Sequence, residues 1–453
     1  MLENYDQGEM KRKAMKIRWL LLSILIAVLS ISHAQVTGQQ TMLAKDFLTL
    51  LQTGQYDAAV DMFDETVRGQ VSPEQLGEFW KTVNIQAGTF REHFNTRTEQ
   101  SHGYDIVYLD CHFGNMDLTI KVVFDANLNI AGFFFTPVET EQKYQPPLYD
   151  NPVNYRIEEI EVGSGEYRLP GKLTVPEGVE SYPLVVLVHG SGPNDMDETI
   201  GPNKIFCDLA SGLANKGIAT LRYDKRTKIY GAQMDGSTLT VYEETIEDAI
   251  TAITMARKME GVSSVVILGH SLGAFVAPRI ANNDNPPAGI IMMAGNARPL
   301  EDLVLDQVTY ILSADGLSPE EQENIHDLQE KVRQIKEQQF TETTLNEELL
   351  LSLPPSYWND LAKYDPVESL KRLTLPVLIL QGERDYQVTM KDFSIWEEET
   401  GEMKNVTMIS YPKLNHLFME GAGKSMPAEY SKPGNIPEYV IGDISAWIKS
   451  ICR

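Results

Sequence analysis

The sequence contains only three cysteines in 453 residues, and they stand far apart at Cys111, Cys207 and Cys452. Their spacing fits neither a zinc-binding motif nor a disulfide framework, so stability must come from buried apolar cores. Positive charge is also scarce, because 39 Lys and Arg residues face 64 Asp and Glu residues, which gives a net charge of −25. Nucleic acid and anionic membrane surfaces attract basic proteins, so neither is expected as a partner of this acidic chain.

Long apolar runs are scarce as well. One apolar segment of thirteen residues, 19–31, follows a basic stretch and precedes Ser32-His33-Ala34. Thirteen residues are too few to span a bilayer comfortably, and the pattern is typical of a cleavable signal peptide. We therefore expect cleavage of residues 1–34 after Ala34 and export to the periplasm or the medium, without stable membrane insertion. An uncleaved anchor is the alternative.

Residues 40–137 predict a small α+β domain, because helical spacing gives way to period-two alternation. The expected helices are 42–53, 56–67 and 72–83, and the expected antiparallel strands are 90–100, 104–113, 116–124 and 130–136. This order resembles the NTF2-like (cystatin-like) domains, of the DUF3887 type, that precede some bacterial exported hydrolases. His93, His102 and His112 lie in this region, but without carboxylates at ligand spacing they indicate ordinary surface or pocket positions. A proline-rich linker is expected at 138–154.

Residues 155–453 predict an α/β domain in which strands and helices alternate. The expected strands are 156–162 and 167–175, as an antiparallel entry pair, then 182–188, 218–223, 264–268, 289–293, 375–380 and 406–410; the main helices are 204–216, 245–259 and 441–451. This alternation predicts a parallel sheet covered by helices on both faces. Residues 297–363 interrupt it with expected helices at 300–314, 318–339 and 344–351. The interruption is too long for a connecting loop, so we expect a helical cap over the carboxyl edge of the sheet.

The strongest motif is Gly269-His270-Ser271-Leu272-Gly273, which follows a buried strand and precedes a helix. A nucleophile elbow has this strand–turn–helix context, and its sharp turn needs residues without bulk near the serine. Ser271 is therefore the candidate nucleophile, at the helix N-terminus, where negative charge is favoured. A glycine-rich turn with an incidental serine is the alternative.

Three further signals each follow a predicted strand. His189-Gly190-Ser191-Gly192-Pro193 can offer backbone N–H groups to a reacting carbonyl, so the candidate oxyanion donors are the N–H of Ser191 or Gly192 together with that of Leu272. Asp385 follows the strand 375–380, and His416 follows the strand 406–410. The carboxyl ends of parallel strands are where open α/β sheets place their sites. We therefore expect Ser271, Asp385 and His416 to form a catalytic triad. Asp360, Asp365, His270 and His326 are less suitably placed.

These motifs together resemble the α/β-hydrolase superfamily over residues 155–453, and in particular a bacterial esterase subgroup with the HGSGP and GHSLG motifs. The run Arg222-Tyr223-Asp224-Lys225-Arg226 belongs to the same pattern and is expected to form a structural turn. The subgroup usually has a glycine after this run, whereas this chain has Thr227. The turn there is therefore expected to differ.

The resemblance implies a serine esterase with a two-step acyl-enzyme mechanism that needs no metal or organic cofactor. The implied partner is a small-molecule carboxylic ester. Two alternatives stay open at this point. One is a serine peptidase of the same fold, although the sequence contains no sign of a β-propeller or of an anionic clamp for a peptide amine. The other is a ligand-binding module with a vestigial hydrolase domain. The oligomeric state is left open.

Overall fold

The computed structural model describes residues 38–452, except for residues 70, 102, 115, 139–142, 164–166, 232 and 315. The signal peptide expected at 1–34 and His102 lie outside the described residues. The chain divides into two compact units. One contains the chain up to Glu141 together with Ile311–Asn324, and the other contains Gln142–Tyr310 together with Ile325–Arg453.

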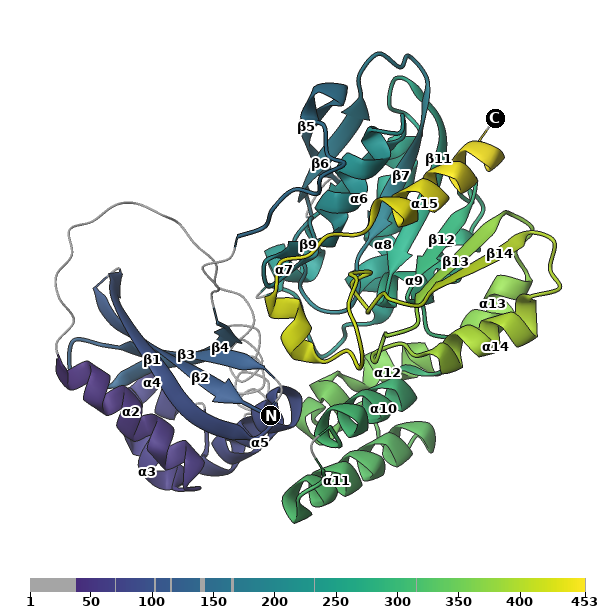
Figure 1. Cartoon of the computed structure of the whole chain (residues 1–453). Helices are drawn as coiled ribbons and strands as arrows, with labels where there is room; N and C mark the ends of the chain where they lie inside the picture. Colours follow the sequence, from purple (N-terminus) through teal and green to yellow (C-terminus); the bar gives the residue numbers. More distant parts are fainter. Residues whose placement is uncertain are drawn as a thin grey trace, which may run out of the picture. The chain divides into compact units, whose positions relative to one another are not determined.

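The front unit has helices followed by an antiparallel four-stranded sheet (Figure 1), as the change of period predicted. Its elements are α2 (Gly38–Gln52), α3 (Tyr56–Asp61), α4 (Glu65–Arg68), α5 (Pro73–Ala87), β1 (Phe90–Ser101), β2 (Tyr104–Phe113), β3 (Asp117–Phe124) and β4 (Ile130–Pro137). The single helix predicted at 56–67 is wrong, because Phe63 forms a β-bridge with Ile130. Asp64 then begins a new helix by accepting a hydrogen bond from the Val67 N–H.

A core of its own holds the front unit together. The Ser72 and Gln75 side chains and backbones form a capping box that starts α5, with Pro73 at the first helical position, as expected. Phenylalanine rings fill the space between helices and sheet, and Phe63 stacks on Phe133 with ring centroids 5.6 Å apart. The two histidines described here have local partners, Thr96 for His93 and Asp117 for His112.

The second unit is built on an eight-stranded sheet with the order β14-β13-β12-β11-β7-β10-β6-β5. The strands are β5 (Tyr155–Val162), β6 (Leu169–Pro176), β7 (Tyr182–Val188), β10 (Ala219–Tyr223), β11 (Val262–His270), β12 (Ile290–Met293), β13 (Val377–Gly382) and β14 (Val406–Tyr411). β6 pairs antiparallel with β5 and β10, and the other pairs are parallel. The predicted antiparallel entry pair and parallel sheet are therefore confirmed. The short strands β8 (Thr199–Ile200) and β9 (Asn203–Lys204) form a separate ribbon.

Helices cover this sheet. α6 (Ile205–Ala214) and α15 (Glu438–Ile451) lie against one another on one face of the sheet (Figure 1). Their buried side chains share a core with alternate residues of the central strands. α8 (Glu247–Ala256) and α9 (Leu272–Ala281) pack on the strands β7, β11 and β12. α8 is preceded by a π-helical turn, η2 (Tyr242–Ile246), which the sequence did not predict. α14 (Met390–Thr400) precedes β14.

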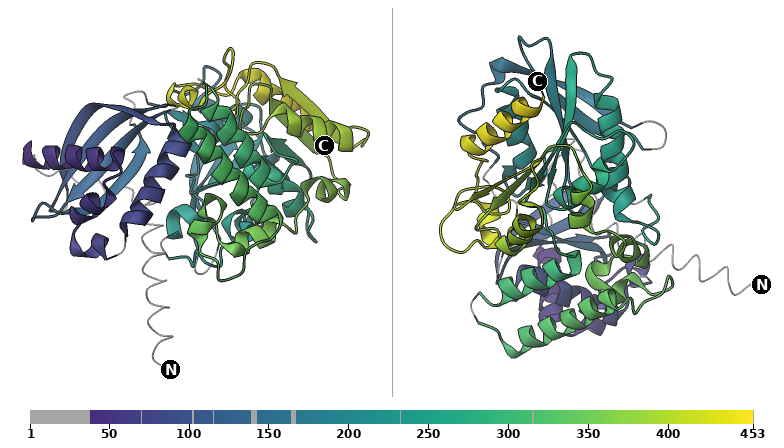
Figure 2. Two further views of the ribbon diagram at one scale, coloured as in Figure 1. Left: turned by 90° about the horizontal axis from the view of Figure 1, so that it is seen from below. Right: turned by 90° about the vertical axis from the view of Figure 1, so that its right-hand side faces the viewer.

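Between β12 and β13 the chain is mainly helical, as predicted. The helices are α10 (Leu300–Leu312), α11 (Pro319–Lys336), α12 (Pro355–Leu361) and α13 (Pro366–Lys371). Figures 1 and 2 both show α10 and α11 side by side, and an ion pair between Lys336 and Asp302 joins them. The helix expected at 344–351 is replaced by two 3-10 turns, Asn346–Glu348 and Leu350–Ser352, because Leu349 between them has an extended backbone (φ −98°, ψ 160°) that interrupts an α-helix.

Candidate active site

The GHSLG motif forms a strained turn at the end of β11. Ser271 has φ 53° and ψ −116°, a conformation that is rare for a residue with a side chain, and it precedes the first residue of α9. The two glycines of the motif are sterically required. A Cβ atom on Gly269 would lie 2.2 Å from the Gly273 carbonyl oxygen, and one on Gly273 would lie 2.1 Å from that of Val188. The local backbone is thus that of a nucleophile elbow.

His416 and Asp385, which lie on different loops, are brought into direct contact. The His416 Nδ1 atom lies 2.7 Å from the Asp385 Oδ2 atom, and both side chains are buried. The other Asp385 oxygen accepts hydrogen bonds from the backbone N–H groups of Gln387 and Val388, at 2.8 and 3.0 Å. Gln381 donates to Oδ2 at 3.2 Å. Asp385 is therefore held rigidly, which fixes the tautomer and orientation of His416.

A second histidine connects the His416 loop to the elbow. The Nε2 atom of His270 lies 2.9 Å from the His416 carbonyl oxygen, and the two rings have centroids 4.8 Å apart. His270 directly precedes Ser271 in the chain. The His416 loop and the Ser271 turn are therefore linked through the His270 side chain and backbone.

His270 also forms a buried ion pair, with 3.2 Å between its Nδ1 atom and the Glu198 Oε1 atom. Burial alone would lower the pKa of His270, but the negative charge of Glu198 raises it above its usual value. In the same way, burial would raise the pKa of Glu198, but the charge of His270 lowers it. Since Nε2 donates to a carbonyl, Nδ1 needs a proton of its own to face a carboxylate, which agrees with these directions.

The candidate oxyanion loop after β7 lies next to the elbow. A Cβ atom on Gly190 would lie 3.2 Å from the Ser271 Cβ atom. Gly192 has φ 89°, a conformation that favours glycine, and its N–H donates to the Glu244 Oε1 atom at 3.3 Å. Within the described part of the chain, the Ser191 and Leu272 N–H groups have no protein acceptor. Of the predicted donors, these two are the ones left to bind an oxyanion.

His189, the first residue of this loop, is buried. Its ring is buried between Phe206 and Tyr223, with centroids 5.0 and 5.4 Å away. Burial lowers the pKa of His189 to about 4, so the imidazole is neutral near pH 7.

Four residues at this site were not predicted to act there, namely Glu198, Lys225, Glu244 and Tyr357. The Lys225 Nζ atom lies 2.8 Å from the Gly190 carbonyl oxygen and 2.6 Å from Glu244 Oε1. Lys225 belongs to the Arg222–Arg226 run, for which the sequence predicted only a structural turn. Thr227, where related chains have glycine, lies in the first turn of α7 (Arg226–Tyr230) with helical backbone, so no glycine is needed there.

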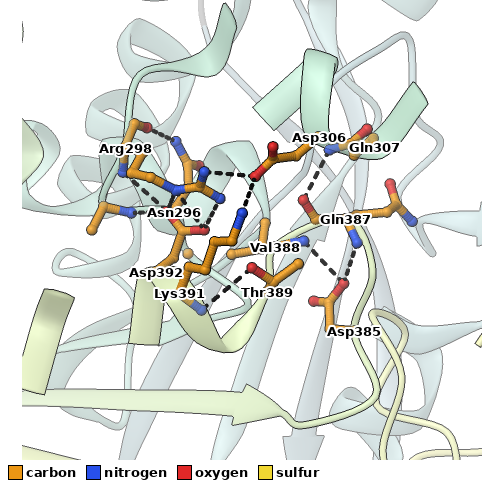
Figure 3. Close-up of polar contacts among 12 residues, drawn as sticks. Asn296, Arg298, Asp306, Gln307, Asp385, Gln387, Val388, Thr389, Lys391 and Asp392 are labelled. Atoms are coloured by element: carbon orange, nitrogen blue, oxygen red, sulfur yellow. Dashed lines mark hydrogen bonds and ion pairs between the residues drawn. The ribbon is translucent and has the colours of Figure 1, made fainter. Parts of the chain in front are cut away.

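The loop that carries Asp385 is joined to the cap by polar contacts (Figure 3). Gln307 of α10 donates to the Gln387 carbonyl oxygen at 3.1 Å. Arg298, just before α10, pairs with the buried Asp392 of α14 at 2.8 Å and with Asp306 at 2.7 Å. α10 is thereby fixed to the segment that positions Asp385.

The rival residues have other partners. Asp360 pairs with Arg279 at 2.8 Å, and Asp365 caps α13 by accepting from the Glu368 N–H. His326 is exposed on α11. Among the described residues, these three form no hydrogen bond or ion pair with His416, whereas the fourth rival, His270, contacts the His416 carbonyl oxygen and ring.

A cavity of about 650 Å³ lies between the cap helices and the core, with Phe275, Leu300, Trp358 and Ile395 among its lining residues. Ser271, Asp385 and His416 are not among the residues that line this cavity. We therefore do not assign it to the reacting part of a substrate. The described residues contain no helix long and apolar enough to cross a membrane, and no group of three or more His, Cys, Asp or Glu side chains that could hold a metal ion.

Comparison with known proteins places this geometry in a family. A family model described as "Serine aminopeptidase, S33" matches residues 181–421, and one described as a protein of unknown function (DUF3887) matches residues 44–133. Esterase EstD of Thermotoga maritima is 40% identical over 403 residues, which cover 89% of this chain and 93% of that protein.

Solved structures give weaker likenesses. Est1E from Butyrivibrio proteoclasticus is 16% identical and matches with a TM-score of 0.43 over 65% of this chain and 98% of its own. The acylaminoacyl peptidase of Pyrococcus horikoshii is 13% identical and matches with a TM-score of 0.46 over 79% of this chain and 56% of its own. The family assignment depends on the sequence matches, which span both units. The chain therefore belongs to the α/β-hydrolase family of enzymes that includes Esterase EstD of T. maritima, with a DUF3887 α+β domain in front.

Proposed function

We propose that this chain is a serine esterase that hydrolyses small-molecule carboxylic esters through an acyl-enzyme. The observation that carries the proposal is the hydrogen bond of 2.7 Å between His416 and Asp385, on the loop that His270 joins to the strained Ser271 elbow. In this mechanism His416 takes the Ser271 proton and the serine oxygen attacks the ester carbonyl. The N–H groups of Ser191 and Leu272 bind the resulting oxyanion.

The second half of the reaction uses the same groups. His416 gives its proton to the departing alcohol and then activates a water molecule, which attacks the acyl-enzyme and releases the acid. Asp385 keeps its charge throughout and stabilises the protonated imidazole. The similarity to Esterase EstD supports an ester as the substrate.

Replacing the nucleophile tests this proposal. Ser271→Ala should lower kcat on p-nitrophenyl esters by several orders of magnitude, because no oxygen remains to form the acyl-enzyme. A fluorophosphonate probe should label the wild-type chain at Ser271 and leave the variant unlabelled. Circular dichroism should be unchanged, since the variant removes one oxygen atom. Activity within about tenfold of wild type would contradict the assignment.

A peptide bond is the second candidate substrate, because the matching family model is described as a serine aminopeptidase. Parallel assays on p-nitrophenyl esters and aminoacyl p-nitroanilides separate the two activities. A higher kcat/KM on the anilides would replace the esterase proposal. A chain that hydrolyses neither and fails to react with the fluorophosphonate would be a binding module.

We also propose export through the segment 1–34 and an NTF2-like fold for the front domain. The export proposal is supported by the basic and apolar pattern before Ala34. N-terminal sequencing of protein recovered from the periplasm or the medium should begin at Gln35. The fold proposal is supported by the order of helices followed by an antiparallel meander.

A further inference from the structure

The peptide unit between Gly190 and Ser191 is held through its carbonyl oxygen by a buried lysine. The Gly190 carbonyl oxygen accepts from the Lys225 Nζ atom at 2.8 Å and from the Asn194 Nδ2 atom at 3.2 Å. In a planar trans peptide the carbonyl and the following N–H point in opposite directions. Fixing the Gly190 oxygen therefore also fixes the direction of the Ser191 N–H, on the far side from Lys225.

The neighbouring N–H groups of the loop are already bound. The Gly190 N–H donates to Glu198 at 2.6 Å, and the Gly192 N–H donates to Glu244 at 3.3 Å. The Ser191 N–H lies between them and, among the described residues, has no protein acceptor. Of the three consecutive N–H groups of Gly190, Ser191 and Gly192, the one of Ser191 is thus left as a donor, on a segment that lies against Ser271.

The position of the Lys225 side chain is fixed by buried polar partners. Its side chain is only 2% exposed and pairs with Glu244 at 2.6 Å. Glu244 lies in the π-helical turn η2, and its other oxygen accepts from the Tyr357 hydroxyl at 2.7 Å. Isolated buried charges are expensive, so a lysine here must be fully paired. π-helical turns are frequent at functional sites.

We propose that Lys225 is a positioning residue for the oxyanion hole, acting through the Gly190–Ser191 peptide. It orients the Ser191 N–H toward the reacting carbonyl, and its charge on the Gly190 oxygen polarises the amide and strengthens that N–H as a donor. Lys225 does not touch the substrate. The inference rests on the proposed serine mechanism, and it assigns a role that neither the elbow nor the triad requires.

The test removes the lysine without leaving a buried charge. In Lys225→Met/Glu244→Gln the pair is neutral, and the glutamine can still accept from Gly192. We expect kcat on a p-nitrophenyl ester to fall about 10- to 100-fold with KM within about twofold, since loss of an entire oxyanion donor costs about 10²–10³. The affinity for a trifluoromethyl ketone, whose serine adduct carries the oxyanion, should fall by the same factor.

The neighbouring ion pair provides a matched control. Arg226 and Asp248 form an equally buried pair, and Arg226 otherwise contacts Glu247 and Tyr167 rather than the oxyanion loop. Arg226→Met/Asp248→Asn should lower the thermal midpoint to a similar extent but leave the affinity for the ketone unchanged. Equal losses of kcat and of ketone affinity in the two double variants would overturn the proposal.

A milder variant decides the question if the double variant does not fold. Asn194 is only partly buried, and Asn194→Ala removes the second donor to the same carbonyl oxygen. It should lower kcat and ketone affinity severalfold at unchanged KM, whereas unchanged values of both would overturn the proposal. Labelling of wild-type Ser271 by a fluorophosphonate is measured alongside. If the wild-type chain is not labelled, the serine mechanism itself is wrong. If every variant is labelled at the wild-type rate, only the role of Lys225 is rejected.

Discussion

At the scale of single residues, the site depends on backbone conformations that side chains normally avoid. Among the described residues, eight other than glycine have a positive φ, from 49° to 68°. Two of them, Ser271 and Glu198, belong to the nucleophile elbow and to the support of the oxyanion loop. Such conformations persist only where the surrounding structure holds them, and they are concentrated at functional sites.

The second glycine of the GHSLG motif gives a direct test of this steric requirement. Gly273→Ala places a Cβ atom 2.1 Å from the Val188 carbonyl oxygen, and a buried strand cannot move away. We expect a loss of about 3 kcal/mol or more in the free energy of unfolding, together with loss of activity. Gly442→Ala in α15 is the control, because its Cβ atom would have no neighbour within 4 Å. Urea unfolding should show that this change stabilises the chain by up to about 1 kcal/mol.

At the scale of elements, polar contacts hold the cap and the linker to the α/β core. Asp392 of α14 is fully buried and accepts from the Ala297 and Arg298 N–H groups and from the Arg298 guanidinium. These contacts fix the start of α10 near the loop that carries Asp385 (Figure 3).

Removing this anchor should destabilise the chain. Asp392→Ala leaves two buried N–H groups without an acceptor and Arg298 with Asp306 alone. We expect a loss of about 3 kcal/mol, measured as a lower midpoint in thermal unfolding. Glu330→Ala on α11 breaks an exposed ion pair with Arg333 and should leave the midpoint unchanged. A midpoint for Asp392→Ala equal to that of the control would show that α10 is held by other contacts.

A buried aspartate connects the linker to the core and predicts a pH dependence of stability. Asp208 accepts from Tyr144 at 2.8 Å and from the Ile436 N–H at 2.9 Å, and burial raises its pKa to about 7. The folded state therefore binds the proton more tightly than the unfolded state. Asp208 contributes most to stability below about pH 4, and this contribution, on the order of 2–4 kcal/mol, is lost as the pH rises to 7.

The aspartate can be replaced by a neutral group of the same shape. Asp208→Asn should reduce the difference in urea midpoint between pH 5 and pH 8 relative to wild type, because the group no longer titrates. Unfolding curves at the two pH values for both proteins provide the measurement. An unchanged difference would mean that other carboxyl groups cause the pH dependence.

At the scale of the whole molecule, each of the two units has a hydrophobic core of its own among the described residues. A protein with two cores need not unfold in a single step. Leu76→Ala in α5 removes a fully buried side chain from the front core and should lower the stability of that unit by about 2–5 kcal/mol. The urea concentration at which half of the ester turnover is lost should stay at its wild-type value. Tryptophan fluorescence should show an additional transition at a lower urea concentration. A matching shift of both midpoints would show that the units unfold together.

Much of this arrangement could be predicted from the residues alone. The period of apolar positions located the strands of both sheets within a few residues, because burial on a sheet imposes a period of two or a continuous apolar run. The GHSLG motif located the elbow, because only glycine fits where the structure brings Gly269 and Gly273 against backbone. Asp385 and His416 were identified by their position after parallel strands, where the chain returns to the same edge.

Tertiary structure alone decided which buried charges support the site. Lys225 and Glu244 are separated by 19 to 52 residues from the groups that they hold. Glu198 lies 8 residues from Gly190, in a segment without a distinctive pattern, and its other partner, His270, lies far along the chain. Ionic contacts of this kind depend on where loops meet in space, and no local spacing encodes them. The break between α3 and α4 and the 3-10 turns at 346–352 have the same origin, since a β-bridge at Phe63 and an extended backbone at Leu349 override helical propensity. The sequence thus determined the fold and the candidate triad through local patterns, whereas the free N–H of the oxyanion loop follows from contacts that form only when the chain is folded.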